Sequence, residues 1–354
     1  MVAYGLPTLH QKRGGIERVA HSLAQGLAAR RHDVVVFSHD ERPAGAQYDV
    51  RPLPWTAFVN TWFGRRATMG YLGNVLAMLP DYSTFDAVIA CGDSVCMPLV
   101  HRRVVRIMMG SALGEARSAR SFGRRVLQSG VYVQELLTAA TQTTVGISDN
   151  TRQFNPFVRR TIGLCVDSRL LFPRPEQKSA FPSLIFVGTA EGRKRGKLLV
   201  DLFSRILRPE LPDATLMFVG PRGPSLPGVS YHTGVSDEEL AALYRRAWVY
   251  ASPSVYEGFG LPYLEAMACG TAVVATPNPG SCEVLAGGEY GMLAGDDTLA
   301  ETLLRLLNSP EERRGLEAAG LRRARELSLD SMIDRYEKLL TDLCNGHVRS
   351  LAST

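Results

Sequence analysis

The sequence has no uncharged apolar run of 18 residues, so no segment has the pattern of a conventional membrane-spanning helix. Its first residues show no basic stretch followed by an apolar one, so we expect no secretory signal. The six cysteines form no C-x-x-C pair and no metal-type cluster, and no low-complexity tract or internal repeat is present. We therefore expect reduced thiols in a cytoplasmic protein.

The residues that are present describe a globular chain with two domains. A chain of 354 residues is too long for one ordinary hydrophobic core. A composition of 45% hydrophobic and 21% charged residues is typical of globular folds. Residues 1–165 contain 19 Lys and Arg against 11 Asp and Glu, whereas residues 166–354 contain 21 against 24. The basic first half predicts an anionic partner, such as a lipid surface, a phosphorylated acceptor or a nucleic acid. Solvated basic faces are the alternative.

Both halves alternate short β-branched runs with longer amphipathic patterns, which is typical of βαβ units and parallel sheets. In the first half we expect a helix over residues 16–31 and five strands, near Met1–Tyr4, Val34–Phe37, Ala87–Ala90, Val104–Met108 and Val145–Ile147. The first strand is short for the centre of a parallel sheet, so we expect the native start upstream of Met1.

The second half predicts strands at 184–187, 215–219, 248–251 and 272–275, with helices between them. Ser236 and Glu239 have the spacing of a capping box, and Ser309-Pro310 has the pattern of a capped helix start. The proline-bearing stretch 172–182 is the expected linker between two doubly wound domains.

A segment with two carboxylates carries the strongest chemical signal. Glu257-Gly-Phe-Gly-Leu-Pro-Tyr-Leu-Glu265 spans the expected loop after a strand and the first turns of the next helix. Open α/β sheets bind ligands at the carboxyl ends of their strands, where glycines and helix amides allow a phosphate to approach. Glu265 can accept hydrogen bonds from a ribose diol, and Glu257 from a sugar hydroxyl. Alternatively, Glu265 complements the helix dipole and Glu257 caps a turn.

This segment resembles the E-x7-E signature of the retaining glycosyltransferases of family 4, which have the GT-B fold. Looser similarities run along most of the chain, at residues 14–19, 31–36, 166–173 and 275–283. The resemblance implies two Rossmann-like domains with doubly wound parallel sheets that face each other across a cleft. They are an acceptor-binding domain at 1–165 and a nucleotide-sugar-binding domain at 166–330. A C-terminal helix within 331–354 is expected to cross back onto the first domain.

By the same resemblance, Glu265 contacts the donor ribose and Glu257 the donor sugar. Further donor contacts come from the backbone of Phe259, Gly260 and Leu261, with Gly15 near the diphosphate. The resemblance also implies transfer with retention and without a metal ion. The sequence has no D-x-D pair, which argues against a metal-dependent enzyme of the GT-A type.

A basic loop supplies the cations that neutralise a diphosphate leaving group. It covers residues 188–196, after the first expected strand of the second half, and contains Arg193, Lys194 and Arg195. We expect Lys194 first and Arg193 second to act on the diphosphate together with the catalytic Glu257. Gly188 and Arg195 are expected donor contacts. A solvated basic loop is the alternative.

Two departures from the family pattern bear on activity. The family has an Arg directly after the glycine of the basic loop, where Thr189 stands here, and a Lys five residues later. Many members also have a His at the end of a first-domain strand, where this sequence has Met109; neither His101 nor His10 has the matching position. Either the chemistry tolerates Met109, or turnover is slow, or the protein no longer catalyses. A front-face displacement, in which leaving phosphate oxygens take the acceptor proton, requires no His nucleophile.

An aromatic and basic stretch in the first half is a candidate membrane contact. It contains Trp55, Phe58, Trp62, Phe63, Arg65 and Arg66, and apolar residues follow at 71–79. Such a segment can lie on an anionic membrane, or it can form core or the lining of an acceptor pocket. Nucleic acid is not expected, because no aromatic-basic sheet or helix-turn-helix pattern accompanies the charge.

The sequence therefore predicts an enzyme that moves a hexose from a nucleotide-diphosphate sugar to a glycan, lipid-linked or small-molecule acceptor. No cofactor is expected, and a UDP-sugar is the favoured donor because uridine is the commonest base in the family. A non-catalytic nucleotide-sugar-binding protein and a nucleotide-sugar epimerase of the same fold are the alternatives. The expected role is polysaccharide, glycolipid or glycosylated-metabolite assembly, in the cytoplasm or at the inner face of the membrane.

Overall fold

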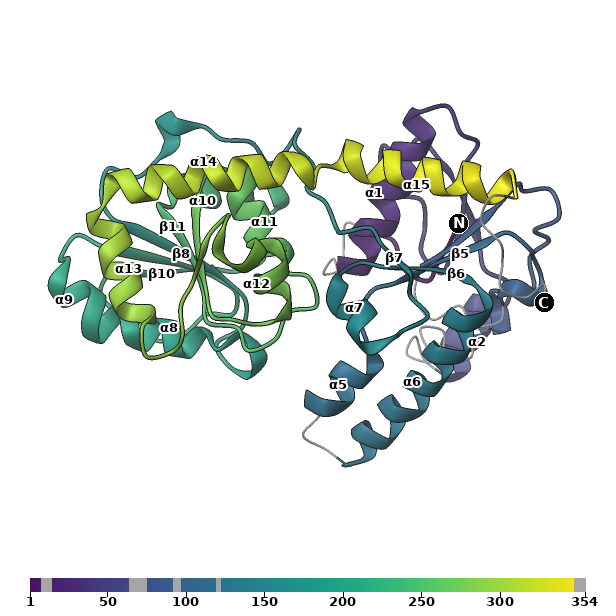
Figure 1. Cartoon of the computed structure of the whole chain (residues 1–354), viewed down its shortest axis with the longest axis horizontal. Coiled ribbons are helices and arrows are strands. Elements are labelled where there is room, and N and C mark those ends of the chain that lie inside the picture. The colour runs from purple at the N-terminus through teal and green to yellow at the C-terminus, as the bar shows by residue number, and fades with distance from the viewer. Residues whose placement is uncertain (8–14, 64–74, 92–96, 119–121, 347–354) are drawn as a thin grey trace. The chain divides into compact units, whose positions relative to one another are not determined.

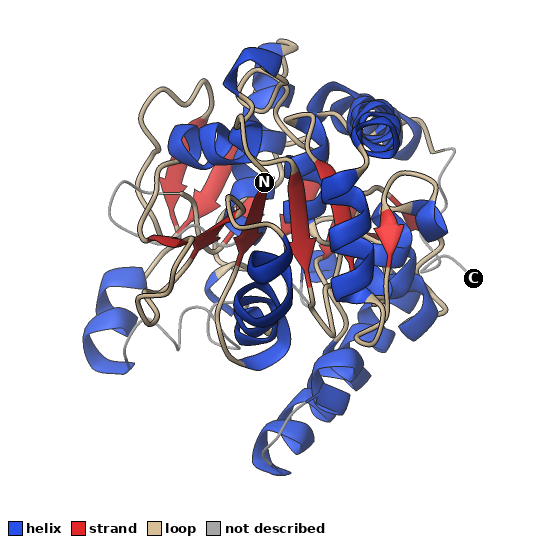
Figure 2. Ribbon diagram, turned by 90° about the vertical axis from the view of Figure 1, so that its left-hand side faces the viewer, coloured by secondary structure: helices blue, strands red, loops and turns tan. Residues whose placement is uncertain are grey.

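The computed structural model describes residues 1–7, 15–63, 75–91, 97–118 and 122–346, which form two compact units (Figure 1). Unit 1 contains Met1–Leu164 together with Asp330–Thr354, and unit 2 contains Cys165–Leu329. Each unit is built on one parallel sheet with helices packed against it (Figure 2). The α/β class predicted from the sequence is confirmed. None of the helices within the described residues is long and apolar enough to cross a membrane.

Unit 1 has a seven-stranded sheet in the order β3-β2-β1-β4-β5-β6-β7, in which every pair of neighbours is parallel. The strands are β1 Val2–Ala3, β2 Val35–Ser38, β3 Asp49–Pro52, β4 Val88–Cys91, β5 Val104–Met108, β6 Thr143–Gly146 and β7 Arg160–Thr161. The helices are α1 Gly15–Ala29, α2 Thr56–Phe63, α5 Ala112–Ser118, α6 Phe122–Thr141, α7 Asp149–Phe154 and α15 Leu329–Cys344, with a 3-10 turn at Met97–Leu99.

The central strands of unit 1 follow the sequence pattern, and the edge strands do not. β2, β4 and β5 are wholly buried, as their β-branched runs predict for a sheet covered on both faces. β3 is polar and largely exposed, and β7 has only two residues. An edge strand needs no continuous apolar run, so the sequence pattern does not predict these two.

The C-terminal helix α15 packs against α1 within unit 1. Ile333 is buried at 1% exposure, and a Cβ added to Gly26 of α1 would lie 2.4 Å from its Cδ1 atom. Arg30 and His32 bind the carboxylate of Glu337 at 2.7 and 2.8 Å. Burial of one such aliphatic side chain contributes about 1.5–3 kcal/mol, more than these partly exposed ion pairs. The helix expected to lie on the first domain thus contacts α1 through an apolar residue.

Unit 2 has a six-stranded parallel sheet in the order β10-β9-β8-β11-β12-β13. The strands are β8 Ser183–Val187, β9 Thr215–Val219, β10 Val229–His232, β11 Val249–Ser252, β12 Ala272–Ala275 and β13 Met292–Leu293. The helices are α8 Gly196–Leu202, α9 Arg208–Glu210, α10 Asp237–Arg246, α11 Leu261–Ala268, α12 Pro279–Val284, α13 Leu299–Asn308 and α14 Pro310–Glu326, and a π-helical turn covers Phe203–Leu207.

The strand order of unit 2 indicates a candidate ligand site. Counted along the chain, the order is 3-2-1-4-5-6, which is the doubly wound arrangement. The direction of winding reverses between β8 and β11. In open α/β sheets, ligands occupy the crevice outside the carboxyl ends of the two strands at this switch point. The loops that follow β8 and β11 are therefore the candidate site.

Two helix starts in unit 2 have the caps that the sequence predicts. The Ser236 hydroxyl accepts from the Glu239 amide at 3.1 Å, and the Ser236 amide donates to the Glu239 carboxylate at 2.7 Å. Ser309 caps α14, whose first residue is Pro310. Both predicted caps are confirmed. They could be predicted because a cap depends only on residues close together in the sequence.

The prediction of a linker at 172–182 is wrong, because this stretch packs on unit 2. Arg245 donates to the Phe172 carbonyl at 2.9 Å and lies 4.4 Å over its ring. The Lys178 ammonium donates to the carbonyls of Ala247 and Gly270, each at 2.7 Å. Arg245 thus binds a carbonyl of the stretch, while Lys178 within the stretch binds carbonyls beyond the ends of α10 and α11.

Candidate active site

Two loops meet at the switch point of unit 2. The basic loop follows β8, and the loop at 253–260 follows β11. The Val255 amide donates to the Arg193 carbonyl at 2.9 Å, which joins the two loops through their backbones. The predicted carboxylate and cations are thereby brought to one place.

Glu257 binds Lys194 and Arg193, the two cations of the basic loop that are expected to act on the diphosphate. Its Oε1 atom lies 2.5 Å from Lys194 Nζ, and its Oε2 atom accepts from Arg193 Nη1 at 2.6 Å. The side chains of Glu257 and Lys194 are 7% and 15% exposed, whereas that of Arg193 is 53% exposed. Arg193 Nη1 also donates to the Tyr256 carbonyl at 2.8 Å. One carboxylate is thus shared by a buried ammonium and a more exposed guanidinium.

The charges of this cluster set the ionisation of Glu257. Burial by itself would raise the pKa of its carboxyl, but the neighbouring charges of Lys194 and Arg193 outweigh this effect and lower the pKa below its ordinary value. The carboxylate is therefore ionised at neutral pH. Since it carries one negative charge against two positive ones, the cluster keeps a net positive charge that favours an anionic ligand.

Arg195, a predicted donor contact, has other partners in the structure. Its guanidinium forms two parallel hydrogen bonds to Asp296, at 2.6 and 2.7 Å, and donates to the Pro253 carbonyl at 2.6 Å. Its backbone is left-handed, with φ of 50° between the 3-10 turn at Gly192–Lys194 and α8. Arg195 thus ties the basic loop to the loop after β11 and to the segment before α13.

Gly280, the second residue of α12, supports the backbone that carries Glu257. The Gly280 amide donates to the Glu257 carbonyl at 3.0 Å. A Cβ added to Gly280 would lie 2.6 Å from the Phe259 carbonyl oxygen and 2.8 Å from Glu257 Cβ. The close approach of α12 to this loop therefore requires glycine.

A buried polar network behind the loop escapes prediction from the sequence. The Asn278 amide group donates to the Ser254 carbonyl at 3.0 Å and to the Tyr263 hydroxyl at 3.1 Å. The Thr276 hydroxyl donates to the same Ser254 carbonyl at 2.7 Å. The signal in the sequence is the cluster of polar residues after β12, which also carries part of the family resemblance. Its role depends on contacts between residues that lie 15 to 24 positions apart in the sequence.

Glu265 lies on α11 and is 6% exposed. Its carboxylate accepts a hydrogen bond from the Tyr244 hydroxyl of α10 at 3.0 Å. Tyr250 of β11 makes edge contacts with Tyr244 and with Tyr263, each with ring centroids 5.9 Å apart. The Tyr250 ring thus packs between those of Tyr244 and Tyr263, and Tyr244 is a polar partner of Glu265.

The start of α11 follows the predicted glycine pattern. Gly260 has φ of 96°, and a Cβ there would lie 2.3 Å from the Tyr263 ring. Phe259 is buried, and Leu261 is the first residue of the helix. On the other side of the site, a Cβ at Gly188 would lie 3.0 Å from Lys194 Cγ. Glycines thus allow both loops to turn tightly beside the charged cluster.

The remaining predicted residues belong to unit 1. Gly15 is the first residue of α1, while Gly14 and His10 lie outside the described residues, as do Arg65 and Arg66. Met109 directly follows β5 and is half-buried. The structure places no described histidine at this strand end. Among the described residues, no three His, Cys, Asp or Glu side chains gather in a way that could hold a metal ion.

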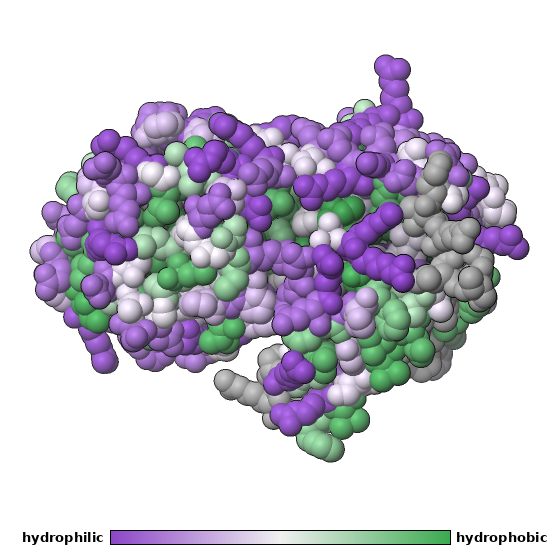
Figure 3. Space-filling model, in the orientation of Figure 1, coloured by the Kyte–Doolittle hydropathy of each residue, from purple (hydrophilic) through white to green (hydrophobic). Residues whose placement is uncertain are grey.

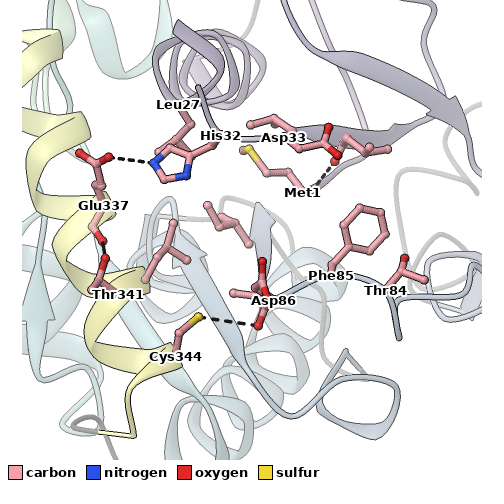
Figure 4. Close-up of a pocket in the computed structure, with 15 residues that line it drawn as sticks. Met1, Leu27, His32, Asp33, Thr84, Phe85, Asp86, Glu337, Thr341 and Cys344 are labelled. Atoms are coloured by element: carbon pink, nitrogen blue, oxygen red, sulfur yellow. Dashed lines mark hydrogen bonds and ion pairs between the residues drawn. The ribbon is translucent and has the colours of Figure 1, made fainter. Parts of the chain in front are cut away.

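A cavity in unit 1 lies at the amino ends of its strands, whereas ligands of such sheets bind at the carboxyl ends. It measures about 430 Å³ and is lined at the amino ends of β1, β2 and β4 and by α15 (Figure 4). His32 faces Glu337 on one side, and the Cys344 thiol lies 3.8 Å from the Asp86 carbonyl (Figure 4). Doubly wound sheets bind ligands at the carboxyl ends of their strands, so this cavity is not the candidate active site.

The part of the chain that matches a known family lies within unit 2. Residues 181–309 match the family model described as glycosyl transferases group 1. The chain is 50% identical over 99 residues to MMP alpha-(1->4)-mannosyltransferase of Mycolicibacterium hassiacum, covering 27% of this chain and 24% of that protein. It is 33% identical over 163 residues to O-antigen chain mannosyltransferase B of Escherichia coli, covering 42% of each. The matches thus span less than half of either relative.

Solved structures match over nearly the whole chain at low identity. Sucrose-phosphate synthase from Thermosynechococcus elongatus has a TM-score of 0.73 and 19% identity, with 94% of each chain covered. HepE of Anabaena, solved with UDP and glucose, has a TM-score of 0.71 and 15% identity, covering 96% of this chain and 98% of that chain. At such identities the likeness establishes the fold, and the predicted GT-B architecture is confirmed. Residues 181–309 therefore match the glycosyl transferases group 1 model, within a chain that has the GT-B fold.

Proposed function

We propose that this protein is a glycosyltransferase that takes a sugar from a nucleoside-diphosphate sugar bound by unit 2. The observation that carries the proposal is the convergence of Lys194 and Arg193 on Glu257 at the switch point between β8 and β11. The match of residues 181–309 to glycosyl transferases group 1 and the two mannosyltransferase relatives support it.

The chemistry follows from the charges of the cluster. When the bond between the sugar and the diphosphate breaks, negative charge develops on the leaving phosphate oxygens. Lys194 and Arg193 are already oriented by Glu257, so they can stabilise this charge without reorganising. Glu257 keeps the ammonium and guanidinium in place, and its carboxylate can accept a hydrogen bond from a donor hydroxyl. Glu265 is proposed to hold the ribose from its position on α11.

Retention of anomeric configuration and independence from metal are finer parts of the proposal. Two cations in the basic loop supply positive charge of the kind that a metal ion supplies elsewhere. A front-face displacement, in which the leaving phosphate accepts the acceptor proton, agrees with Met109 at the end of β5. A UDP-sugar is the proposed donor, supported by the UDP-bound state of the HepE structure. The O-antigen relative supports an acceptor in polysaccharide assembly.

The test is release of nucleoside diphosphate from a panel of nucleoside-diphosphate sugars, each with and without sugar acceptors. We expect release that depends on an acceptor, persists in a metal chelator, and gives a product with the donor's anomeric configuration by NMR. Conversion of the donor without an acceptor would instead identify an epimerase. In calorimetry, Glu265→Ala is expected to weaken donor binding; unchanged affinity for every nucleoside diphosphate tested contradicts its proposed role.

A non-catalytic binding protein is the second candidate, because Thr189 and Met109 replace two polar residues of the family pattern. It predicts donor binding by unit 2 with no release above background for any acceptor. The same panel separates the two functions, since binding and release are measured independently.

A further inference from the structure

Exposed apolar side chains are concentrated in unit 1. Of the exposed large hydrophobic residues in the described part of the chain, twelve belong to unit 1 and three to unit 2. The three in unit 2, Phe181, Ile206 and Val255, lie on separate segments. Single exposed apolar residues are ordinary, whereas a contiguous group indicates an interaction surface.

The helix α6 carries the main group. Phe122, Val126, Val133 and Leu137 are 80%, 55%, 55% and 65% exposed. Their spacings of four, seven and four residues place them on one face of the helix. In Figure 3, green side chains gather over α6 in the lower part of unit 1. A helix of 20 residues thus presents an apolar stripe to its surroundings.

In the second half of α6, the face opposite the stripe buries two polar side chains beside the small Ala139, whereas Leu127 in the first half is exposed. Glu135 and Thr138 are 6% and 3% exposed. The Glu135 carboxylate accepts from the Ala112 amide at 3.1 and 3.2 Å, and the Thr138 hydroxyl accepts from Arg106 of β5. A surface helix in water normally has the reverse arrangement, with its apolar face inward. The inverted pattern indicates that the outer face of α6 meets an apolar phase.

A second exposed apolar group lies at α2. Trp55, Phe58 and Trp62 are 68%, 53% and 72% exposed, and their rings follow one another at centroid distances of 6.2 and 6.1 Å. The alternative that this aromatic stretch forms core is therefore wrong for these three side chains. Indole rings are enriched where a membrane meets water, because they combine an apolar body with a polar N–H group.

The net charge of unit 1 indicates what kind of apolar phase α6 meets. The two segments of unit 1, residues 1–164 and 330–354, together contain 22 Lys and Arg against 15 Asp and Glu. The first turn of α6 has no acidic residue, Arg125 is exposed beside the stripe, and the acid Glu135 is buried. Two copies of this chain facing each other would bring two positively charged units together. An anionic lipid surface instead offers both an apolar interior and opposite charge.

We propose that α6 and α2 of unit 1 dock on the surface of an anionic lipid bilayer. The stripe Phe122, Val126, Val133 and Leu137 enters the boundary between headgroups and acyl chains, and the α2 rings lie at headgroup level. This inference concerns unit 1 and does not depend on donor chemistry in unit 2. It goes beyond the proposed function by assigning an interaction surface.

The test uses the full chain and vesicles of phosphatidylcholine with or without phosphatidylglycerol. We expect co-sedimentation with the anionic vesicles, weakening in about 0.5 M NaCl as charges are screened. The variant V133N/L137N should lower the partition coefficient about tenfold or more, since two apolar side chains no longer enter the interface. The matched control F181S/I206S removes two exposed apolar side chains of unit 2 and should bind as the parent does. Far-UV circular dichroism and the thermal midpoint verify that each variant is folded.

Three results would overturn the proposal. These are absence of binding to anionic vesicles, equal loss in both variants, and a parent dimer that V133N/L137N converts to a monomer while vesicle binding is unchanged. Vesicle binding and nucleotide release are separate readouts, so failure of one proposal leaves the other measurable. The variant R125Q is a second test, because it removes a positive charge beside the stripe. It should bind anionic vesicles more weakly than the parent while keeping the fold.

Discussion

At the scale of single residues, Glu257 organises the positive charge of the site. Its carboxylate binds Lys194 and Arg193 in a mostly buried position. A buried ion pair is weak evidence for stability, because desolvation opposes the attraction. The pair is better explained by orientation: the ammonium and the guanidinium stand ready for a diphosphate that brings further negative charge.

Removal of the buried ammonium should slow transfer, and it should also lower stability because it leaves the Glu257 carboxylate to Arg193 alone. We expect Lys194→Ala to lower the rate of nucleotide release about 100-fold or more, the loss seen when one preorganised donor to a developing anion is removed. The matched control is Lys197→Ala, whose ammonium is exposed and pairs with Asp201 one turn further along α8. Steady-state turnover compares the two variants. Equal rates would contradict the role of Lys194.

The lowered pKa of Glu257 has a consequence for stability. A carboxyl with a folded-state pKa below its ordinary value of 4.5 stabilises the fold above that pH, and this contribution is lost as the pH falls through the folded pKa. The free energy of unfolding should thus exceed that of Glu257→Gln at neutral pH, and the difference should shrink below about pH 4.5. Urea unfolding of both proteins across this range measures it. A difference that does not change with pH would exclude the ionised carboxylate as its cause.

At the scale of elements, α12 holds the loop after β11 in place by close contact. Gly280→Ala would press a methyl group against the Phe259 carbonyl and Glu257 Cβ. We expect a destabilisation of about 1–3 kcal/mol and weaker donor binding, because the loop that carries Glu257 must shift. Gly315→Ala on α14 is the matched control, since a Cβ there meets nothing within 4 Å. The control should be neutral or stabilising, as Ala favours helix over Gly. Thermal unfolding and calorimetry follow both effects, and equal behaviour of the two variants would contradict the argument.

The elements also show how far the sequence predicts this molecule. The strands β8, β9, β11 and β12 have apolar runs, and the caps at Ser236 and Ser309 have local signals, so both were predictable. The edge strands β10 and β13 are partly exposed and short, and lack such runs. The family pattern indicates Glu257, Lys194 and Arg193 as site residues, but their ion pairs join residues more than 60 positions apart and are not predicted. The Asn278 network is not predicted either, because its hydrogen bonds join segments that only the fold brings together.

At the scale of the whole molecule, each sheet has its own core and its own stabilising contacts. In unit 2, Phe186 and Phe218 pack at a ring distance of 4.8 Å within a large buried cluster. In unit 1, α15 returns from the end of the chain to bury Ile333 against α1. The cations Arg245 and Lys178 bind the stretch 172–182 to unit 2. Separate cores predict that the two units lose structure as separate cooperative steps.

This division gives a prediction for thermal unfolding that assigns each step to a unit. In calorimetry of the full chain we expect two transitions. A nucleoside diphosphate at about 100 times its dissociation constant should stabilise unit 2 by about 2.7 kcal/mol and raise only one of them. Ile333→Ala should lower the other, since loss of a buried isoleucine side chain costs about 2–5 kcal/mol. The control Asp334→Ala removes a largely exposed partner of Arg30 on the same helix and should change neither by more than about 1 kcal/mol. If the ligand and Ile333→Ala shift the same single transition, the units unfold together, and the charged cluster is then coupled to the packing of α15.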